Sequence, residues 1–150
     1  METINHECYV SLEIAKLLKK VGFNWEVKTY YHYLSPYDEY NLEFDSISTN
    51  YNHLNNADFS APSLDVAQRW LRDVKGIYVE SVLCVNRGIS GHSFGFSIAE
   101  VSADLSIVKI LYPLTYFDEE ETKGFTKYEL ALEAGIKKAL EMILKIKNEI

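Results

Sequence analysis

The strongest constraint on the fold is the alternation of two spacings along the chain. Three stretches have the apolar spacing of amphipathic helices, and the stretches between them have the composition of β-strands. The first helix is expected from about Val10 to Val21, where apolar residues recur every three or four positions. Ser11 is a suitable N-cap, and Gly22 stands where a left-handed residue ends a helix. This alternation predicts a mixed α and β fold.

Two further helices are expected from the same signals. The second begins after Ala61-Pro62-Ser63, with Ser63 as the N-cap, and ends at Gly76. The third begins near Thr126, where Thr126 and Glu129 have the spacing of a capping box, and continues close to Ile150.

The intervening stretches predict strands. Residues 26–33 and 40–45 are typical of a hairpin with a turn at 35–38. Three more strands are expected at residues 77–85, 92–101 and 106–112, the last of which ends at Pro113. Because the links are short, the strands should pair antiparallel. We therefore predict an α+β fold in the order α-β-β-α-β-β-β-α, with a mainly antiparallel sheet of about five strands and three helices packed on one face.

The length of 150 residues indicates a single α+β domain over residues 1–150. Two stretches have neither pattern. Residues 46–58 contain four asparagines and few apolar side chains, which predicts an exposed loop. Residues 115–125 include the acidic run Asp118–Glu121, which predicts a solvated link into the last helix.

Composition limits the classes of function. The formal net charge is −7, and an acidic chain of this kind is not expected to bind a nucleic-acid backbone directly. The longest apolar run is far shorter than the roughly 18–20 residues of a membrane span. The acidic start at Met1–Glu7 does not resemble a basic signal peptide, so a cytoplasmic protein is expected. Cys8 and Cys84 are too few for a disulfide framework and are expected to stay reduced.

We find no motif that predicts catalysis, a cofactor or a metal. The four histidines lack the paired spacing of zinc ligands. Cys84 and His92 could meet across a hairpin, but no third group that would orient the histidine can be named. The turn Gly88–Gly91 lacks the spacing of a phosphate-binding loop, and a hairpin turn explains it. The sequence therefore argues against an enzyme, which stays the weakest alternative.

The least ordinary feature is the clustering of tyrosines. Of the eleven tyrosines, five lie between residues 30 and 40. Exposed tyrosine beside charged residues is typical of a recognition surface, because the ring is rigid and its hydroxyl is polar. We therefore consider that a hairpin face with Tyr30, His32, Tyr37 and Tyr40 contacts a partner protein. The alternative is that these side chains simply cover the sheet.

Three blocks of sequence also suggest a relationship. They are Tyr9–Leu18, Ala61–Arg72 and Tyr128–Ala134. In these blocks the chain resembles a group of small proteins of gut Bacteroidetes and their phages or mobile elements, which have no established activity. The resemblance implies a cytoplasmic protein, and it supplies no catalytic residue to carry over.

The leading prediction is a non-enzymatic protein-binding accessory factor of a phage or mobile element. The main alternative is an acidic factor linked to nucleic acid, either a DNA mimic or the partner of a basic DNA-binding protein. A mimic should concentrate its carboxylates in one stripe, and here they are scattered along the chain. A homo-oligomer stays open, because an exposed strand or an aromatic patch could pair with a second copy.

Overall fold

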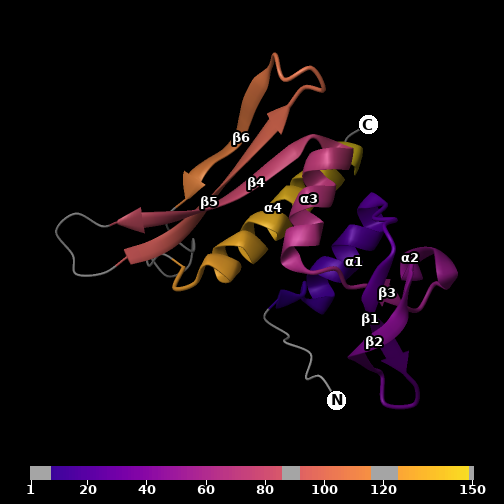
Figure 1. The fold of residues 1–150 in the computed structure, drawn as a ribbon. Helices are drawn as coiled ribbons and strands as arrows, with labels where there is room; N and C mark the ends of the chain where they lie inside the picture. Colours follow the sequence, from indigo (N-terminus) through magenta and orange to yellow (C-terminus); the bar gives the residue numbers. More distant parts are fainter. Residues whose placement is uncertain (1–7, 86–91, 116–124, 149–150) are drawn as a thin grey trace. The chain divides into compact units, whose positions relative to one another are not determined.

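The computed structural model describes residues 8–85, 92–115 and 125–148. The helices are α1 (Leu12–Val21), α2 (Tyr51–Leu54), α3 (Leu64–Lys75) and α4 (Tyr128–Asn148). The strands, shown with the helices in Figure 1, are β1 (Val27–Leu34), β2 (Glu39–Thr49), β3 (Phe59–Ser60), β4 (Ile77–Val85), β5 (His92–Val101) and β6 (Val108–Thr115). The fold is α+β, as predicted.

The strands form two sheets rather than one. The orders are β2-β1-β3 and β4-β5-β6, and every pairing is antiparallel. The predicted single sheet of five strands with three helices is therefore not what forms. Each predicted hairpin is present, but the first recruits the two-residue strand β3, which the sequence pattern did not indicate.

The described contacts group into two compact units. One comprises residues 1–67 with 140–150, and the other comprises residues 68–139. The first unit contains the sheet β2-β1-β3, and the second contains the sheet β4-β5-β6. A single domain over residues 1–150 stays a prediction, and each unit is described separately below.

The predicted helix ends are found at α1 and α3. The Ser11 hydroxyl accepts a hydrogen bond from the Ile14 amide, and Gly22 has a φ of 96°, which a left-handed C-cap requires. Gly76 ends α3 with a φ of 67°. The apolar stripe of α1 buries Ile14 and Leu18 in the core of the first unit.

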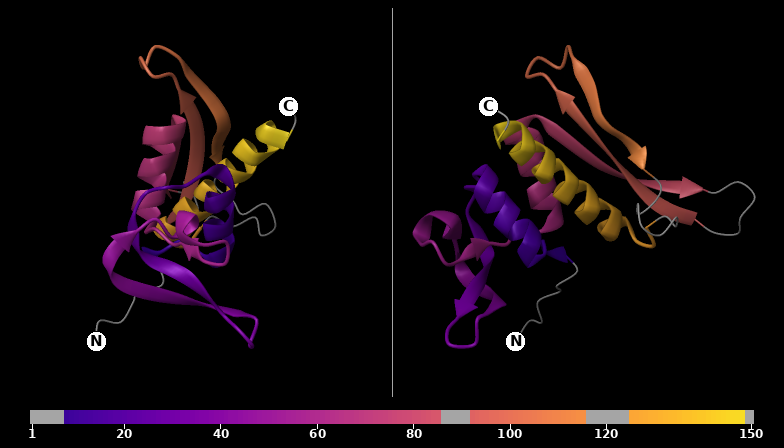
Figure 2. Two further views of the ribbon diagram at one scale, coloured as in Figure 1. Left: turned by 90° about the vertical axis from the view of Figure 1, so that its right-hand side faces the viewer. Right: turned by 180° about the vertical axis from the view of Figure 1, so that it is seen from behind.

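The first sheet has two distinct faces because neighbouring residues of a strand point to opposite sides. In the β1–β2 register, Tyr31 pairs with Leu42 and Tyr33 with Tyr40, while Tyr30 pairs with Glu43 and His32 with Asn41. We call the first set the α1 face, since the Tyr31 hydroxyl donates to the Val10 carbonyl just before α1. The second set is the α2 face, since Tyr51 of α2 stacks on Tyr30. Figure 2 shows this sheet from two further sides.

The segment 46–58, predicted to be an exposed loop, is only partly one. Residues 46–49 extend β2, and the next residues form α2. Tyr51 and Asp58 are buried. The Asn52 side chain explains the order in this segment: its oxygen accepts from the Ser60 amide, and its amide donates to the Phe23 carbonyl. The asparagine side chain therefore hydrogen-bonds to the backbone of this unit, whereas the polar composition of the segment had predicted exposure to solvent.

The second sheet packs one face against α4. A Cβ at Gly135 would lie 2.7 Å from a methyl of Val79 and 3.1 Å from Phe96, so helix and sheet approach closely at this glycine. Strand β6 continues through Pro113, where the sequence predicted its end. Proline is tolerated because β6 is an edge strand with β5 on one side. The acidic link is described only at its ends, Thr115 and Phe125, and residues 116–124 lie outside the described residues.

None of the described helices combines the length and the apolar character that a membrane span needs.

Candidate functional site

The four tyrosine-hairpin residues do not share one face. Tyr30 and His32 lie on the α2 face, with ring centroids 6.0 Å apart. Tyr40 pairs with Tyr33 and lies on the α1 face. Tyr37 lies in the turn between the strands and is 74% exposed. The predicted surface is therefore divided by the pleat of the hairpin, and its α2-face half is the candidate site.

Tyr40 is already engaged by its own surroundings. Its ring lies 5.6 Å from that of Phe59, and the Lys16 ammonium of α1 is 5.2 Å from its centroid. The Lys19 ammonium lies over the Phe59 ring, 5.0 Å from its centroid. These contacts fix the α1 face as packing between sheet and helix.

On the α2 face, Tyr30 is held by an aromatic stack. The rings of Tyr30 and Tyr51 lie 4.0 Å apart and only 16° from parallel. Tyr51 is 3% exposed, so one face of the half-buried Tyr30 ring rests on a buried partner. Such a backed ring is a rigid contact, because little side-chain freedom remains to be lost on binding.

The Tyr51 hydroxyl is buried without a hydrogen-bond partner among the described residues. Burial chiefly raises the pKa of this hydroxyl, and the nearby Thr49 and Asp45 also affect it. Neither of these two side chains meets hydrogen-bond geometry with the hydroxyl. The side-chain oxygen of the neighbouring Asn50 is likewise buried and unsatisfied. Two unsatisfied polar atoms at one place are unusual, because each costs free energy.

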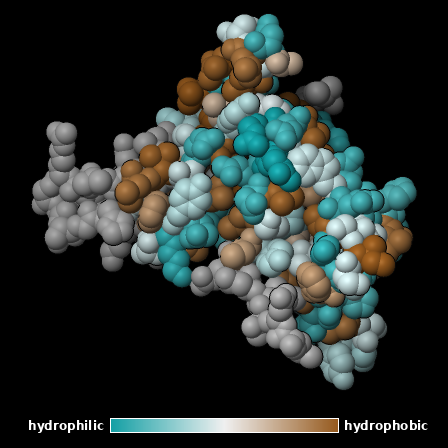
Figure 3. All heavy atoms as spheres, in the orientation of Figure 1, coloured by the Kyte–Doolittle hydropathy of each residue, from teal (hydrophilic) through white to brown (hydrophobic). Residues whose placement is uncertain are grey.

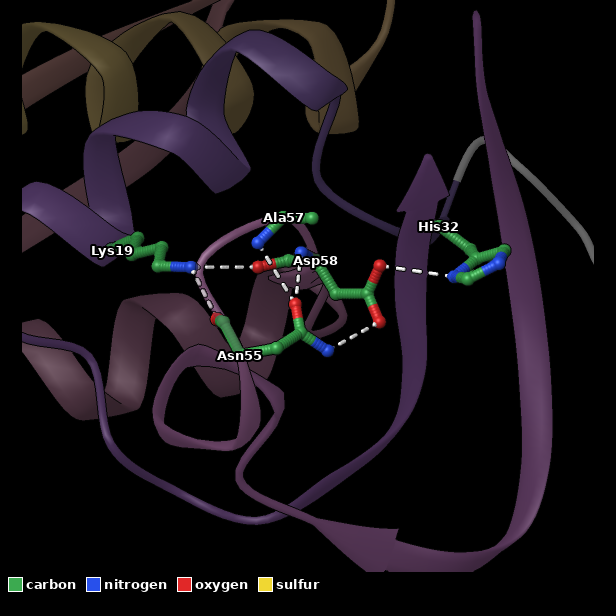
Figure 4. Close-up of polar contacts among 5 residues, drawn as sticks. All are labelled: Lys19, His32, Asn55, Ala57 and Asp58. Atoms are coloured by element: carbon green, nitrogen blue, oxygen red, sulfur yellow. Dashed lines mark hydrogen bonds and ion pairs between the residues drawn. The ribbon is translucent and has the colours of Figure 1, made fainter. Parts of the chain in front are cut away.

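His32 is oriented by a buried carboxylate. Its Nδ1 lies 3.0 Å from Oδ1 of Asp58, and the side chains are 47% and 8% exposed, respectively. The other carboxylate oxygen of Asp58 accepts from the Asn55 side chain at 3.0 Å. In Figure 4 the second ring nitrogen of His32 points away from Asp58. The imidazole is thus fixed at one nitrogen and presented to solvent at the other.

The loop that carries Asp58 is itself secured at its backbone. The Asn55 side-chain oxygen accepts from the amides of Ala57 and Asp58, and the Lys19 ammonium donates to the carbonyls of Asn55 and Asp58 (Figure 4). Burial lowers the pKa of Lys19, and the Asp58 charge partly opposes that effect. A single polar network therefore holds the Asp58–His32 pair in place.

Carboxylates gather around Tyr30. Its pKa is raised, first by burial and then by the charges of Glu43, Asp58 and Asp45. Glu43 lies directly opposite Tyr30, and Asp45 follows at the irregularity in the β1–β2 register. Within the described ranges, neither Glu43 nor Asp45 forms an ion pair. The α2 face therefore presents uncompensated negative charge beside a fixed aromatic ring.

Catalysis by the His32–Asp58 pair would need further groups. An imidazole held by a buried carboxylate resembles an oriented general base, but a nucleophile or a bound proton donor is also needed. Among the described residues no hydroxyl or thiol bonds to the second nitrogen of His32. No group of three potential metal-ligating side chains forms in the part of the chain that the structure describes. As for the other predicted pair, the register opposes Cys84 to Ser93 and His92 to Val85.

The second unit carries an exposed surface of a different kind. Four large apolar side chains of the β5–β6 turn and of β6 are each between 62% and 69% exposed: Leu105, Ile107, Val108 and Ile110. Figure 3 shows apolar colour over the end of this hairpin, at the top of the view. We call these four residues the β6 patch. Exposed apolar residues in a cluster are typical of contact surfaces.

Sequence reasoning missed Tyr51, Asp58 and Glu43. The turn at 35–38 was a usable signal for Glu43. A four-residue turn places Leu34 opposite Glu39, and counting back along both strands puts Tyr40 opposite Tyr33 and Glu43 opposite Tyr30. Asp58 could not be found this way, because it reaches His32 from 26 positions further along the chain.

In comparisons with known proteins, no family model, no curated protein and no solved structure matches this chain.

Proposed function

We propose that this chain is a non-enzymatic, cytoplasmic protein-binding factor, accessory to a phage or mobile element, and that the α2 face is its binding surface. The observation that carries the proposal is the presence of unpaired carboxylates beside the Tyr30 ring, which is held by Tyr51. Rigid aromatic side chains are among the residues that dominate the binding energy of protein interfaces. Fixed carboxylates beside them add charge complementarity toward a basic partner.

The fixed positions of two side chains on the α2 face support the proposed binding function. Asp58 and Asn55 fix the exposed His32, and the stack on Tyr51 fixes the half-buried Tyr30, so both groups are organised before any partner arrives. A surface that is already organised loses less conformational entropy on binding. The proposed setting, a phage or mobile element, rests on the resemblance of the three helical blocks.

A second candidate function is favoured by the same charge. A carboxylate-bearing face suits the basic surface of a DNA-binding protein, so the chain could act as the partner of such a protein. In that case the chain would be recovered with nucleic acid only through that partner.

The test is affinity capture of partners from native host lysate, with and without nuclease. We expect a protein partner that survives nuclease and is lost with Glu43→Lys. Glu26→Lys is the matched control, since Glu26 is exposed, precedes β1 and undergoes the same change of charge. Capture that is equal for both variants would contradict the proposal. Capture that disappears with nuclease would favour the nucleic-acid-linked alternative.

A further inference from the structure

The composition of the α2 face restricts the chemistry of what it can bind. By the alternation of the strands, this face carries one lysine, the exposed Lys28, against the carboxylates Glu39, Glu43 and Asp45. Glu39 pairs with Leu34, which places it on the same face as His32 and Glu43. Lys28 forms no ion pair with these carboxylates among the described residues. The face is therefore complementary to a cation.

A second observation points to the same place independently of the charges. The Tyr51 hydroxyl is buried and has no hydrogen-bond partner among the described residues, and the ring that carries it stacks on Tyr30. An unsatisfied acceptor or donor at a site is satisfied when a ligand or a water brings a complementary group. The α2 face thus combines excess negative charge with unused hydrogen-bonding capacity.

We propose that the α2 face binds arginine side chains of a basic segment on the partner protein. This inference rests on the proposed function and adds the chemical class of the partner. The guanidinium stacks on the Tyr30 ring, which Tyr51 backs from the other side, and it donates to the Glu43 carboxylate.

Arginine fits this arrangement better than lysine for a geometric reason. Its planar guanidinium can stack on an aromatic face and at the same time bond a carboxylate through two parallel donors. A lysine ammonium has neither property and is more strongly hydrated. Because Tyr30 and Glu43 are directly opposed across the strand pair, one guanidinium can reach both.

The experiment measures binding of a fluorescein-labelled peptide of alternating arginine and glycine, followed by anisotropy with the full chain. The comparison peptide has lysine in place of each arginine. We expect tighter binding of the arginine peptide, and a loss of about tenfold in Glu43→Gln, the scale of a hydrogen bond to a charged group. The matched control Glu26→Gln, which removes the same charge elsewhere in the first unit, should bind like the wild type.

Each other outcome overturns the inference. Equal binding of the two peptides, weakened alike by both variants, would mean diffuse attraction to an acidic protein. Displacement of the peptide by calcium at constant ionic strength would assign the face to a divalent cation. An absence of peptide binding would reject arginine recognition, while lysate capture decides the proposed function separately.

A folding control accompanies the variants. Glu43 forms no ion pair among the described residues, so Glu43→Gln should unfold at the wild-type temperature in circular dichroism. If it does not, Glu39→Gln on the same face replaces it, and the expected direction is the same.

Discussion

The two sheets have the same number of strands and the same antiparallel pairing, yet they are stabilised and exposed in different ways. The first sheet is tied by side-chain hydrogen bonds through Asn52, Asn55 and Asp58, and its α2 face is polar. The second packs apolar residues closely around Gly135 and leaves the β6 patch exposed. Three antiparallel strands can thus present either a charged surface or an apolar one.

The α2 face and the β6 patch differ in how selectively each can bind a partner. Charged groups in fixed positions discriminate between partners, because a wrong partner leaves them unpaired. An apolar patch on an edge strand binds with less discrimination, and it can equally pair with a second copy. Under the proposed function, the selective contact is therefore expected at the α2 face.

The largest effect is expected from the core of the second unit. Trp70 is 1% exposed, as the apolar stripe of its helix predicts. Trp70→Ala should lower the free energy of unfolding by about 3–5 kcal/mol through lost packing. Urea unfolding followed by circular dichroism measures it. A loss below about 1 kcal/mol would show that this unit does not depend on its core as described.

A smaller loss is expected where the helix approaches the sheet. Gly135→Val places methyl groups where a Cβ alone already meets Val79 and Phe96. Overpacking of this kind costs about 1–3 kcal/mol. Valine forms helix better than the glycine it replaces, so helix propensity predicts no loss at this position. Leu130→Val on the exposed side of α4 is the reference for a valine that meets no sheet. Equal stabilities of the two variants in urea would contradict the close approach.

The polar network of the first unit should contribute on a similar or smaller scale. Asp58→Ala leaves the His32 and Asn55 donors without their acceptor. The expected loss is about 1–3 kcal/mol in urea unfolding. Glu26→Ala, at an exposed position without these bonds, should change stability by less than about 0.5 kcal/mol. If the two variants lose the same amount, the network is not what secures this unit.

The aromatic stack should be visible in an alkaline titration. Folding raises the pKa values of Tyr30 and Tyr51 above the ordinary 10.0, chiefly through burial. The folded state therefore holds these protons more tightly than the unfolded state. This contribution to stability is complete below about pH 10 and is lost as the pH rises through the folded-state pKa values. Phenolate absorbance should show late-titrating tyrosines, and Tyr51→Phe should remove one of them. Titration of all tyrosines in one step near the ordinary pKa would contradict the stack.

The smallest effect is expected from the Tyr51 hydroxyl itself. Since it has no hydrogen-bond partner in the described residues, Tyr51→Phe should leave stability within about 0.5 kcal/mol of wild type or raise it. Thermal unfolding monitored by circular dichroism checks this. A loss near 2 kcal/mol would mean that the hydroxyl is bonded, and it would remove one support of the arginine proposal.

Local signals predicted most of the elements. Capping residues such as Ser11 and Gly22 act within one turn, so they can be recognised without the rest of the fold. The pairing of β3 with β1 and the contact of Asp58 with His32 depend on chain closure over many residues, and no local pattern specifies them. The stack of Tyr30 on Tyr51 also joins residues far apart in the sequence. Replacing Tyr30 by serine is therefore a poor test of binding, because it would remove a packing contact together with the binding surface.

The most direct measurement compares the two surfaces in one experiment, the capture of the lysate partner by Glu43→Lys and by Ile110→Lys. Each variant places one lysine on one of the two surfaces, and the charge changes by +2 in Glu43→Lys on the α2 face and by +1 in Ile110→Lys on the β6 patch. We predict that Glu43→Lys loses the partner and that Ile110→Lys keeps it. Loss with Ile110→Lys and retention with Glu43→Lys would contradict the account and assign binding to the β6 patch.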